Sequence, residues 1–247
     1  MIEILIIAVF AALQSVFGIG ILFLGTPTLL ILGYSFPDTL SIVLPASIAV
    51  SLLQVLRGTL PTAQWVGEFG LWCLLPLGIV LVIGLSTGLD VELELFVALM
   101  LLAYVVIRLL PNSGRFLEDN VRRFPRVWLL AIGIVHGLSN LGGGLLAIFA
   151  ASTFDDKVAI RGRIAFCYLC FATIQLTVLA VLTPGVMHVE QLGYALLAGA
   201  IFVIIERHVF EAITSPVFDR VFTILIGGYS TVLFLRLFGA FGAVGAA

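Results

Sequence analysis

The sequence predicts an all-α polytopic membrane protein with two inverted-topology repeats. Each repeat is expected to open with a Gly-broken helical hairpin, followed by three membrane-spanning helices. Three observations support this fold class. The chain is too hydrophobic for a soluble domain, its apolar runs are as long as membrane-spanning helices, and its two halves carry similar Gly-rich motifs.

The composition places the chain in a membrane. Of its 247 residues, 62% are hydrophobic and only 11% are charged, and the mean hydropathy is +1.24. A soluble domain of this size cannot bury so much apolar surface. The apolar runs do not alternate with polar residues, as the strands of a transmembrane barrel do. The net charge of −2 and the lack of a basic stripe argue against a nucleic-acid partner.

Long apolar runs, most of them separated by short loops, approach or exceed the roughly 20 residues that cross a bilayer as a helix. The longest polar stretch, 111–126, divides the chain into a first membrane repeat, 1–110, and a second, 127–247, and we expect it to be a cytoplasmic linker. Each half begins with an unusually long run. The runs are 3–33, 39–57, 70–89, 93–110, 127–154, 160–183, 190–206 and 217–238.

Two Gly-rich motifs interrupt the long runs and indicate an internal repeat. They are 14-QSVFGIGILF-23 and 138-LSNLGGGLLA-147. Aligning Ser15 with Ser139 places Gly18 on Gly142 and Gly20 on Gly144. Further along each half, an acidic loop entry is followed by an apolar segment that carries one amide, Gln54 in the first half and Gln175 in the second.

The distribution of basic residues selects between a parallel and an inverted repeat. If both long runs cross the membrane once, the Lys and Arg residues divide almost evenly between its two sides. If both runs are hairpins and the N-terminus is outside, all 12 Lys and Arg residues except Arg236 lie inside. The positive-inside rule favours this second arrangement, in which the halves are inverted relative to each other. Inverted repeats with broken helices are a common plan of secondary transporters.

The Gly breaks have the chemistry of an anion site. In lipid, an irregular backbone survives only against protein or a water-filled cavity. A helix that restarts after a break presents free N–H groups at the positive end of its dipole, and glycine lets a ligand approach them. We therefore predict a substrate-binding site near the membrane midplane. Its residues are Gln14, Ser15, Gly18, Gly20, Ser51, Gln54, His136, Ser139, Asn140, Gly142, Gly143, Gly144 and Gln175.

Structural roles for the same residues stay open at this point. Glycines are common where membrane helices pack closely, and buried amides often bond between helices without touching a ligand. His136 is either a proton carrier or a polar packing residue. Arg161 and Arg163 either extend to the inner interface or attract anions. The three cysteines, Cys73, Cys167 and Cys170, lie in apolar runs, and we interpret them as buried small hydrophobic residues.

These motifs resemble those of the TauE/SafE sulfite exporter family. The best local match is 136-HGLSNLGGGLLAIF-149, with 15-SVFGIGILFLGTPTLLILG-33 as its first-half partner. The resemblance covers nearly the whole chain, although the Pro that usually follows the family's Gly series is missing near Ala147. It implies a multi-pass protein of the bacterial inner membrane that moves small anions such as sulfite, organosulfonates, thiosulfate or carboxylates.

The sequence and the resemblance together suggest a secondary transporter of a small anion such as sulfite or an organosulfonate, and export is the direction that we expect. An anion channel and a permease for a small carboxylate are the alternatives. We expect no enzyme activity, because the three histidines, His136, His188 and His208, are scattered along the chain and no HExxH motif occurs. We expect no metal or other cofactor. The expected partners are the anionic substrate and the lipid bilayer, with a proton as coupling ion and a homodimer left open.

Overall fold

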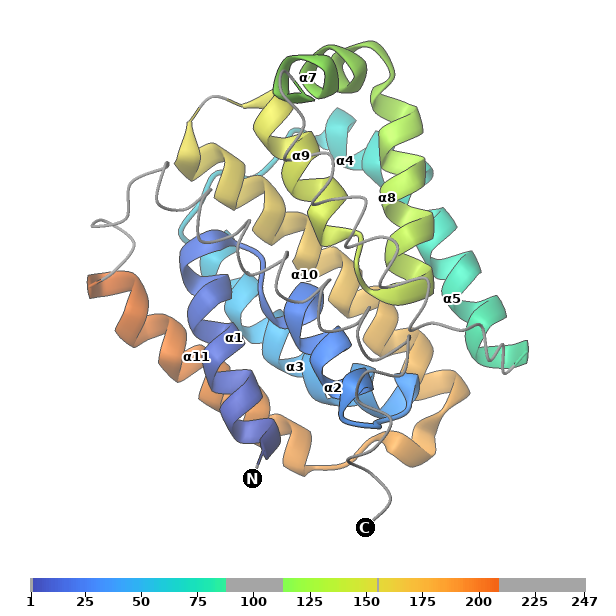
Figure 1. Ribbon diagram of the computed structural model, residues 1–247, viewed down its shortest axis with the longest axis vertical. Helices are drawn as coiled ribbons and strands as arrows, with labels where there is room; N and C mark the ends of the chain where they lie inside the picture. Colours follow the sequence, from blue (N-terminus) through green and yellow to red (C-terminus); the bar gives the residue numbers. More distant parts are fainter. Residues whose placement is uncertain (1, 88–112, 155, 209–247) are drawn as a thin grey trace, which may run out of the picture.

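Every regular element of the described chain is a helix (Figure 1). The computed structural model describes residues 2–154 and 156–208 except for 88–112. The expected runs 93–110 and 217–238 lie outside the described residues. The helices are α1 (Ile2–Phe17), η1 (Ile21–Gly25), α2 (Thr26–Ile31), α3 (Phe36–Val55), α4 (Ala63–Phe69), η2 (Gly70–Leu74), α5 (Leu75–Thr87), α7 (Ser113–Arg123), α8 (Pro125–Ser139), α9 (Gly143–Thr153), α10 (Lys157–Leu182), η3 (Pro184–Val186) and α11 (Glu190–His208).

Three helical segments of the described chain are long and apolar enough to cross a membrane. They are Phe36–Val55, Ala63–Thr87 and Val158–Leu182, with mean hydropathies of 1.6, 2.3 and 2.1. The long runs at the start of each half form pairs of shorter apolar helices instead, α1 with η1–α2 and α8 with α9. The predicted all-helical membrane class is therefore confirmed.

Helices α3 and α10 pack against each other in the middle of the molecule, with α1 and α11 beside α3 and with α5 and α9 beside α10 (Figure 1). Both central helices begin at a side-chain cap. The Ser35 hydroxyl accepts from the Asp38 N–H at 3.2 Å, and the Asp156 carboxylate accepts from the Ala159 N–H at 2.9 Å. Such caps satisfy N–H groups that the first turn leaves without a partner.

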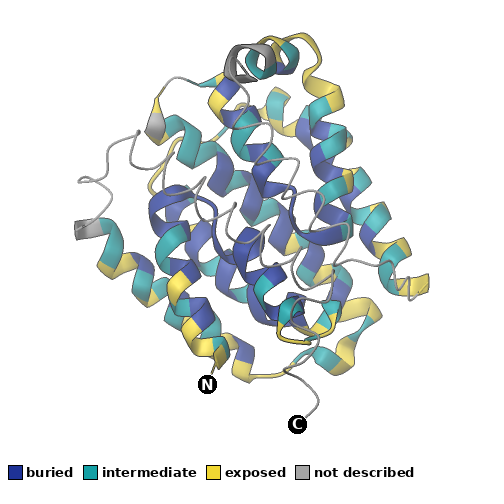
Figure 2. Cartoon of the chain, viewed as in Figure 1, coloured by how far each residue is buried: buried dark blue, intermediate teal, exposed yellow. Residues whose placement is uncertain are grey.

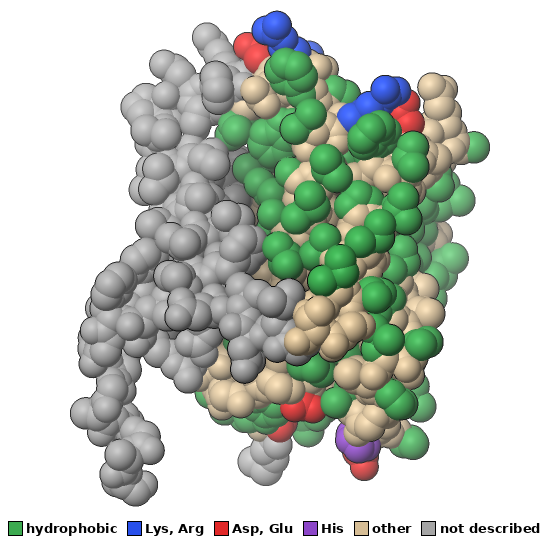
Figure 3. All heavy atoms as spheres, turned by 90° about the vertical axis from the view of Figure 1, so that its right-hand side faces the viewer, with side chains coloured by type: hydrophobic (Ala, Val, Ile, Leu, Met, Phe, Trp, Pro, Cys, Tyr) green, Lys and Arg blue, Asp and Glu red, His purple; other side chains and the backbone are tan. Residues whose placement is uncertain are grey.

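Arginine contacts gather several helix termini at one end of the molecule. Arg57, just after α3, and Arg161, in the first turns of α10, both pair with Glu206 near the end of α11. Arg126, at the start of α8, pairs with Glu68 of α4 at 3.3 Å. Figure 3 shows that, on one face, Lys and Arg side chains lie at the top together with acidic ones, the middle is apolar, and acidic and His side chains lie at the bottom.

Each long run brings its two ends together. Tyr34 follows α2, and its hydroxyl donates to the Glu3 carboxylate in the first turn of α1. In the second half, Arg122 precedes α8 and donates to the carbonyl oxygen of Ser152, at the end of α9, at 3.3 Å. The first run thus ends beside its own beginning, and the second ends beside the helix that leads into it.

The buried core surrounds the interruptions of these two runs (Figure 2). Close backbone packing accompanies it on α8. A Cβ added to Gly137 would lie 2.7 Å from the Leu77 carbonyl oxygen of α5, and one added to Gly133 would overlap the Cys73 carbonyl. These two glycines are therefore packing residues of the kind common at membrane helix interfaces.

Candidate functional site

The first break separates α1 from η1. Gly18 follows the last residue of α1, takes a φ of +76°, and donates its N–H to the Gln14 carbonyl at 2.8 Å. Residues with side chains rarely adopt this φ. Gly20 lies so close to α1 that an added Cβ would be 2.5 Å from the Phe10 carbonyl oxygen and 2.7 Å from the Gln14 nitrogen. The path of the backbone therefore requires both glycines.

The side chain of Gln14 holds the first break against α3. Its Oε1 accepts from the N–H of Ile21, the first residue of η1, at 3.1 Å. Its Nε2 donates to the hydroxyls of Ser47 at 3.2 Å and Ser51 at 3.0 Å. All three polar side chains are fully buried. In this state the first N–H of η1 is therefore satisfied by the protein's own amide.

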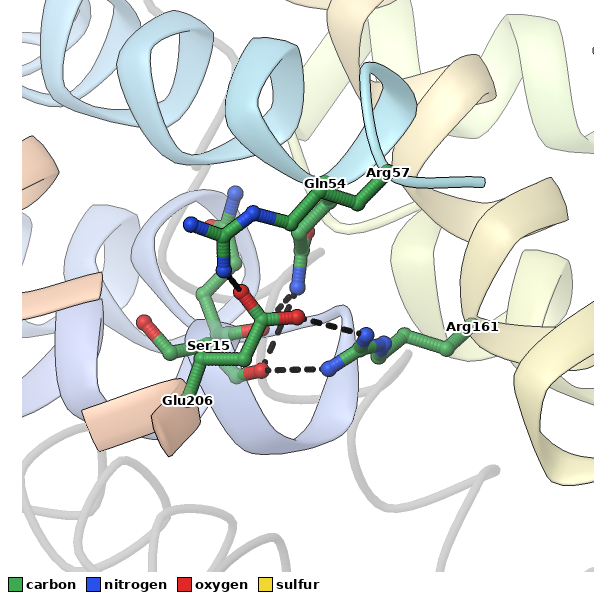
Figure 4. Close-up of polar contacts among 6 residues, drawn as sticks. Ser15, Gln54, Arg57, Arg161 and Glu206 are labelled. Atoms are coloured by element: carbon green, nitrogen blue, oxygen red, sulfur yellow. Dashed lines mark hydrogen bonds and ion pairs between the residues drawn. The ribbon is translucent and has the colours of Figure 1, made fainter. Parts of the chain in front are cut away.

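Gln54 joins the end of α3 to the same break (Figure 4). Its Nε2 donates to the carbonyl oxygens of Gln14 at 2.9 Å and Ser15 at 3.3 Å, whereas its buried Oε1 has no partner among the described residues. Gln54 is the last residue but one of α3. The break therefore lies beside the C-terminal half of this membrane-spanning candidate, from Ser47 to Gln54.

The second break separates α8 from α9. Asn140 follows the last residue of α8, takes a φ of 64°, and donates its N–H to the His136 carbonyl at 2.9 Å. A Cβ added to Gly142 would lie 2.8 Å from the Ile132 carbonyl oxygen and 3.1 Å from the His136 nitrogen. The second break thus folds back against its preceding helix as the first one does.

The two breaks match residue by residue. Gly18 in the first break and Asn140 in the second take the positive φ. Two residues later, Gly20 and Gly142 each lie close to the backbone of the preceding helix, at the residues ten and six positions earlier in the chain. The sequence alignment, which placed Gly18 on Gly142, was therefore wrong by two residues. Asn is one of the few other residues that tolerate the left-handed region, so it can stand where the first half has Gly.

The serines that suggested the wrong alignment have local roles. The Ser15 hydroxyl donates to the Ala11 carbonyl of its own helix at 2.6 Å, and the Ser139 hydroxyl donates to the Val135 carbonyl at 2.8 Å. Both bonds are of the common kind that a helical Ser makes with the carbonyl four residues earlier. The Ser139 oxygen also accepts from the Leu141 N–H at 3.3 Å. Ser139 therefore helps to close the turn between α8 and α9.

His136 stands at the second break where Gln14 stands at the first. Its side chain is fully buried, with the Phe171 ring 4.3 Å and the Tyr168 ring 5.9 Å from the imidazole, measured between centroids. Neither ring nitrogen has a hydrogen-bond partner among the described residues. The Gln175 Nε2 donates to the His136 carbonyl at 3.5 Å, as Gln54 does to Gln14. A buried polar group without a partner is costly, which makes this imidazole a candidate for ligand contact.

Gly143 and Gly144 begin α9 against α10. A Cβ added to Gly143 would overlap the Tyr168 hydroxyl, so this position accommodates only glycine while Tyr168 stays in place. The Gly144 N–H donates to the Leu141 carbonyl at 3.4 Å. Both glycines are buried. They therefore bring the positive end of α9 into the protein interior beside an aromatic hydroxyl.

One hydrogen bond connects the two breaks directly. The Asn140 Nδ2 donates to the hydroxyl of Thr26, the first residue of α2, at 2.8 Å. The segment from Ile21 to Thr26 thus has Gln14 at its start and Asn140 at its end. Sequence reasoning singled out Gln14 and Asn140 but missed Thr26, because a threonine in an apolar run has no distinguishing signal of its own.

A charged cluster adjoins the first break. The Arg161 Nη1 donates to the Ser15 carbonyl at 3.3 Å, and its Nη2 pairs with the Glu206 carboxylate at 2.9 Å (Figure 4). Sequence analysis left open whether Arg161 extends to the inner interface or attracts anions, and it provided no reason to connect the distant Glu206 with the site. Arg163 has a different environment, with its guanidinium 3.8 Å from the centre of the Trp65 ring.

Apart from this charged cluster, the polar groups around the two breaks are neutral amides, hydroxyls and one imidazole. They can donate hydrogen bonds to an anion without a fixed positive charge, and so can also release it. Within the described ranges, no three His, Cys, Asp or Glu side chains are placed to hold a metal ion. Thr173 and Thr177, which flank Gln175 in the sequence of α10, are exposed and bond to carbonyls of α10 itself.

A comparison with protein-family models finds one match. The model described as sulfite exporter TauE/SafE matches residues 3–235, which is nearly the whole chain. Neither a curated protein nor a solved structure matches the chain.

Proposed function

Since the chain belongs to the sulfite exporter TauE/SafE family, we propose that it is a secondary transporter that exports a small anion such as sulfite or an organosulfonate. The family is one of membrane transporters, which agrees with the apolar helices. The observation that carries the proposal is the pair of matched backbone breaks, each with a buried polar side chain, Gln14 or His136, at the same place.

We further propose that each long run is a hairpin and that the two halves are inverted repeats. The contacts of Tyr34 with Glu3 and of Arg122 with Ser152 support a return of each run to its starting side. The matched register of the breaks supports the repeat. The gathering of arginines at one end of the molecule supports an inside location for that end, by the positive-inside rule.

The proposed anion site lies around the segment Ile21–Thr26. On one side are Gln14 with Ser47 and Ser51, and on the other are Asn140 and His136. In the state described, Gln14 caps the Ile21 N–H, so the anion has to compete with or rearrange this amide. Such an exchange of internal for substrate hydrogen bonds links binding to a change of conformation.

Outward movement of an anion has a ready source of energy. An inside-negative membrane potential drives each negative charge outward by about 2.3 kcal/mol per 100 mV. A proton is the coupling ion that we propose, with His136 as its carrier, because this imidazole is buried between aromatic rings with both nitrogens unpaired among the described residues.

Counterflow in proteoliposomes tests the transport proposal. Vesicles loaded with unlabelled sulfite should accumulate labelled sulfite faster than empty vesicles, because a carrier exchanges substrate across the membrane. A matched pair of variants then locates the site. Ser51→Ala removes a buried hydroxyl that faces Gln14, whereas Thr173→Ala removes an exposed hydroxyl of α10. We expect Ser51→Ala to weaken sulfite affinity by about tenfold, the loss from one hydrogen bond to a charged ligand, and Thr173→Ala to leave it unchanged. Equal affinities in the two variants would place the site elsewhere.

A second pair of variants tests the proton. His136→Gln gives the second break the residue that the first break has, and His188→Gln changes an exposed histidine outside it. We expect a transmembrane pH gradient to change the rate of sulfite transport in the unaltered protein and in His188→Gln, but not in His136→Gln. A gradient effect that persists in His136→Gln would remove the imidazole from the coupling mechanism. Loss of counterflow with retained flux would instead favour the channel alternative.

A further inference from the structure

Two arginines and one glutamate from three helices meet beside the first break (Figure 4). Arg57 pairs with one carboxylate oxygen of Glu206, and Arg161 pairs with the other at 2.9 Å. The Arg161 and Glu206 side chains are only 11% and 12% exposed, whereas the Arg57 side chain is 51% exposed. The cluster is therefore buried on its inner side and reaches the surface at Arg57.

The cluster has the composition of an anion site that the protein itself occupies. Among the described residues of the cluster, two guanidinium groups face one carboxylate, so cationic groups outnumber anionic ones there. Guanidinium groups bind carboxylate, sulfonate and phosphate-like oxygens through the same paired N–H geometry. The Glu206 carboxylate thus stands where the oxygens of a small external oxyanion would stand.

Both arginines have a second anchor that does not depend on Glu206. The Arg161 Nη1 donates to the Ser15 carbonyl at 3.3 Å, and its Cγ lies 3.4 Å from a Cβ built on Gly18. The Arg57 guanidinium lies 5.2 Å from the centre of the Phe202 ring, one turn before Glu206 on α11. The pair of guanidinium groups would therefore keep its arrangement when the carboxylate leaves.

We propose that Arg57 and Arg161 form an anion-binding site beside the first break, and that a sulfite- or sulfonate-class oxyanion enters it by displacing the Glu206 carboxylate. The inference rests on the proposed function for the class of anion. A gain in stability alone would be a weak reason for this Arg–Glu–Arg cluster, because the cost of removing the charges from water offsets much of the free energy of their attraction.

Titration of the purified full-length protein with sulfate and with sulfite tests the proposal. Glu206→Gln removes the competing charge and keeps the size of the side chain. We expect it to lower the dissociation constant for these anions by about tenfold or more, as loss of a charged competitor in a paired site should. Glu68→Gln is the matched control, because it removes the carboxylate of another Arg pair, 3.3 Å from Arg126, with the same change of net charge. It should leave the dissociation constant unchanged.

Two further variants test whether the increase in anion affinity of Glu206→Gln depends on the two arginines. In the combinations of Glu206→Gln with Arg57→Gln or with Arg161→Gln, the gain should disappear. Glu206→Asp covers the case in which Glu206→Gln does not fold. It keeps the charge but withdraws the carboxylate by one methylene group, and it should strengthen anion binding by a smaller factor. Unchanged anion affinity in Glu206→Gln, or in Glu206→Asp as its substitute, would overturn the proposal, as would a gain that survives removal of either arginine.

The outcome separates this inference from the proposed function. Counterflow in the unaltered protein with no gain in Glu206→Gln would remove the arginine site and keep the transporter. A gain in Glu206→Gln with no sulfite flux in the unaltered protein would keep the anion site and remove the proposed transport activity.

Discussion

Replacing Gly20 with Ala should destabilise the protein more than any other single methyl addition at the first break. The new Cβ would lie 2.5 Å from the Phe10 carbonyl oxygen and 2.7 Å from the Gln14 nitrogen, inside the 3.0 Å below which Cβ contacts are essentially absent. Both neighbours are backbone atoms of α1, so neither can rotate away. Overpacking typically costs 1–3 kcal/mol, and a contact with fixed backbone belongs at the upper end, about 3 kcal/mol.

Thermal unfolding of the purified protein measures this cost. For a chain of this length, about 3 kcal/mol corresponds to a melting temperature lower by roughly 6–12 °C. Gly193→Ala is the control, because this glycine is exposed on α11 and has nothing within 4 Å of an added Cβ. Its melting temperature should stay the same or rise slightly, since Ala favours a helix. If Gly20→Ala and Gly193→Ala melt alike, the close approach after the first break does not exist as described.

Further predictions concern the individual contacts of the two breaks. Gly18→Asn should melt at a higher temperature than Gly18→Ala, because Asn140 already holds the same left-handed φ, whereas Ala there costs about 1–2 kcal/mol. Gly143→Ala should be strongly destabilising through its overlap with the Tyr168 hydroxyl. Adding Tyr168→Phe should recover part of that loss, and a double-mutant cycle that shows independent effects would disprove the contact. Asn140→Gly keeps the left-handed φ but should lose the bond that the amide donates to Thr26, and Thr26→Val should cost little more once that bond is gone; additive losses would argue against the bond.

The helical class and the location of the breaks could be predicted from the sequence, because both depend on local composition. Apolar runs of bilayer length indicate membrane helices, and glycines inside such runs indicate interruptions. The interruptions at Gly18–Gly20 and at Asn140–Gly142 both lie within the two Gly-rich motifs, although the second begins two residues earlier than the alignment predicted. The register between the two was not predictable in the same way, because it depends on which residue takes the positive φ.

The alignment error shows how similarity of residue type can mislead. Ser15 and Ser139 look like counterparts, yet each bonds to its own helix and neither defines the turn. The backbone of Asn140 takes the same left-handed φ as Gly18, and its side-chain amide donates a hydrogen bond to Thr26. No single-sequence pattern distinguishes an Asn that is needed for its φ from one that is needed for its amide.

The partners of the predicted amides also depend on tertiary structure. Sequence analysis placed Gln54 in the binding site with an interhelical bond as the alternative, and the structure shows its Nε2 bonded to two carbonyls at the end of α1. Glu206 had no signal at all, because its connection to Arg161 spans 45 residues and depends on how α11 packs. Buried ion pairs between distant helices follow from packing that composition and spacing do not reveal.

Locating a bound anion directly would test the transport site most decisively. Selenite has the shape and charge of sulfite, and its selenium scatters X-rays anomalously. An anomalous difference map of crystals grown with selenite would therefore show directly where the anion binds. We predict an anomalous peak in contact with Gln14 or His136, beside the segment Ile21–Thr26. A peak confined to the protein surface, from a protein that still transports sulfite, would contradict an anion site at the two breaks.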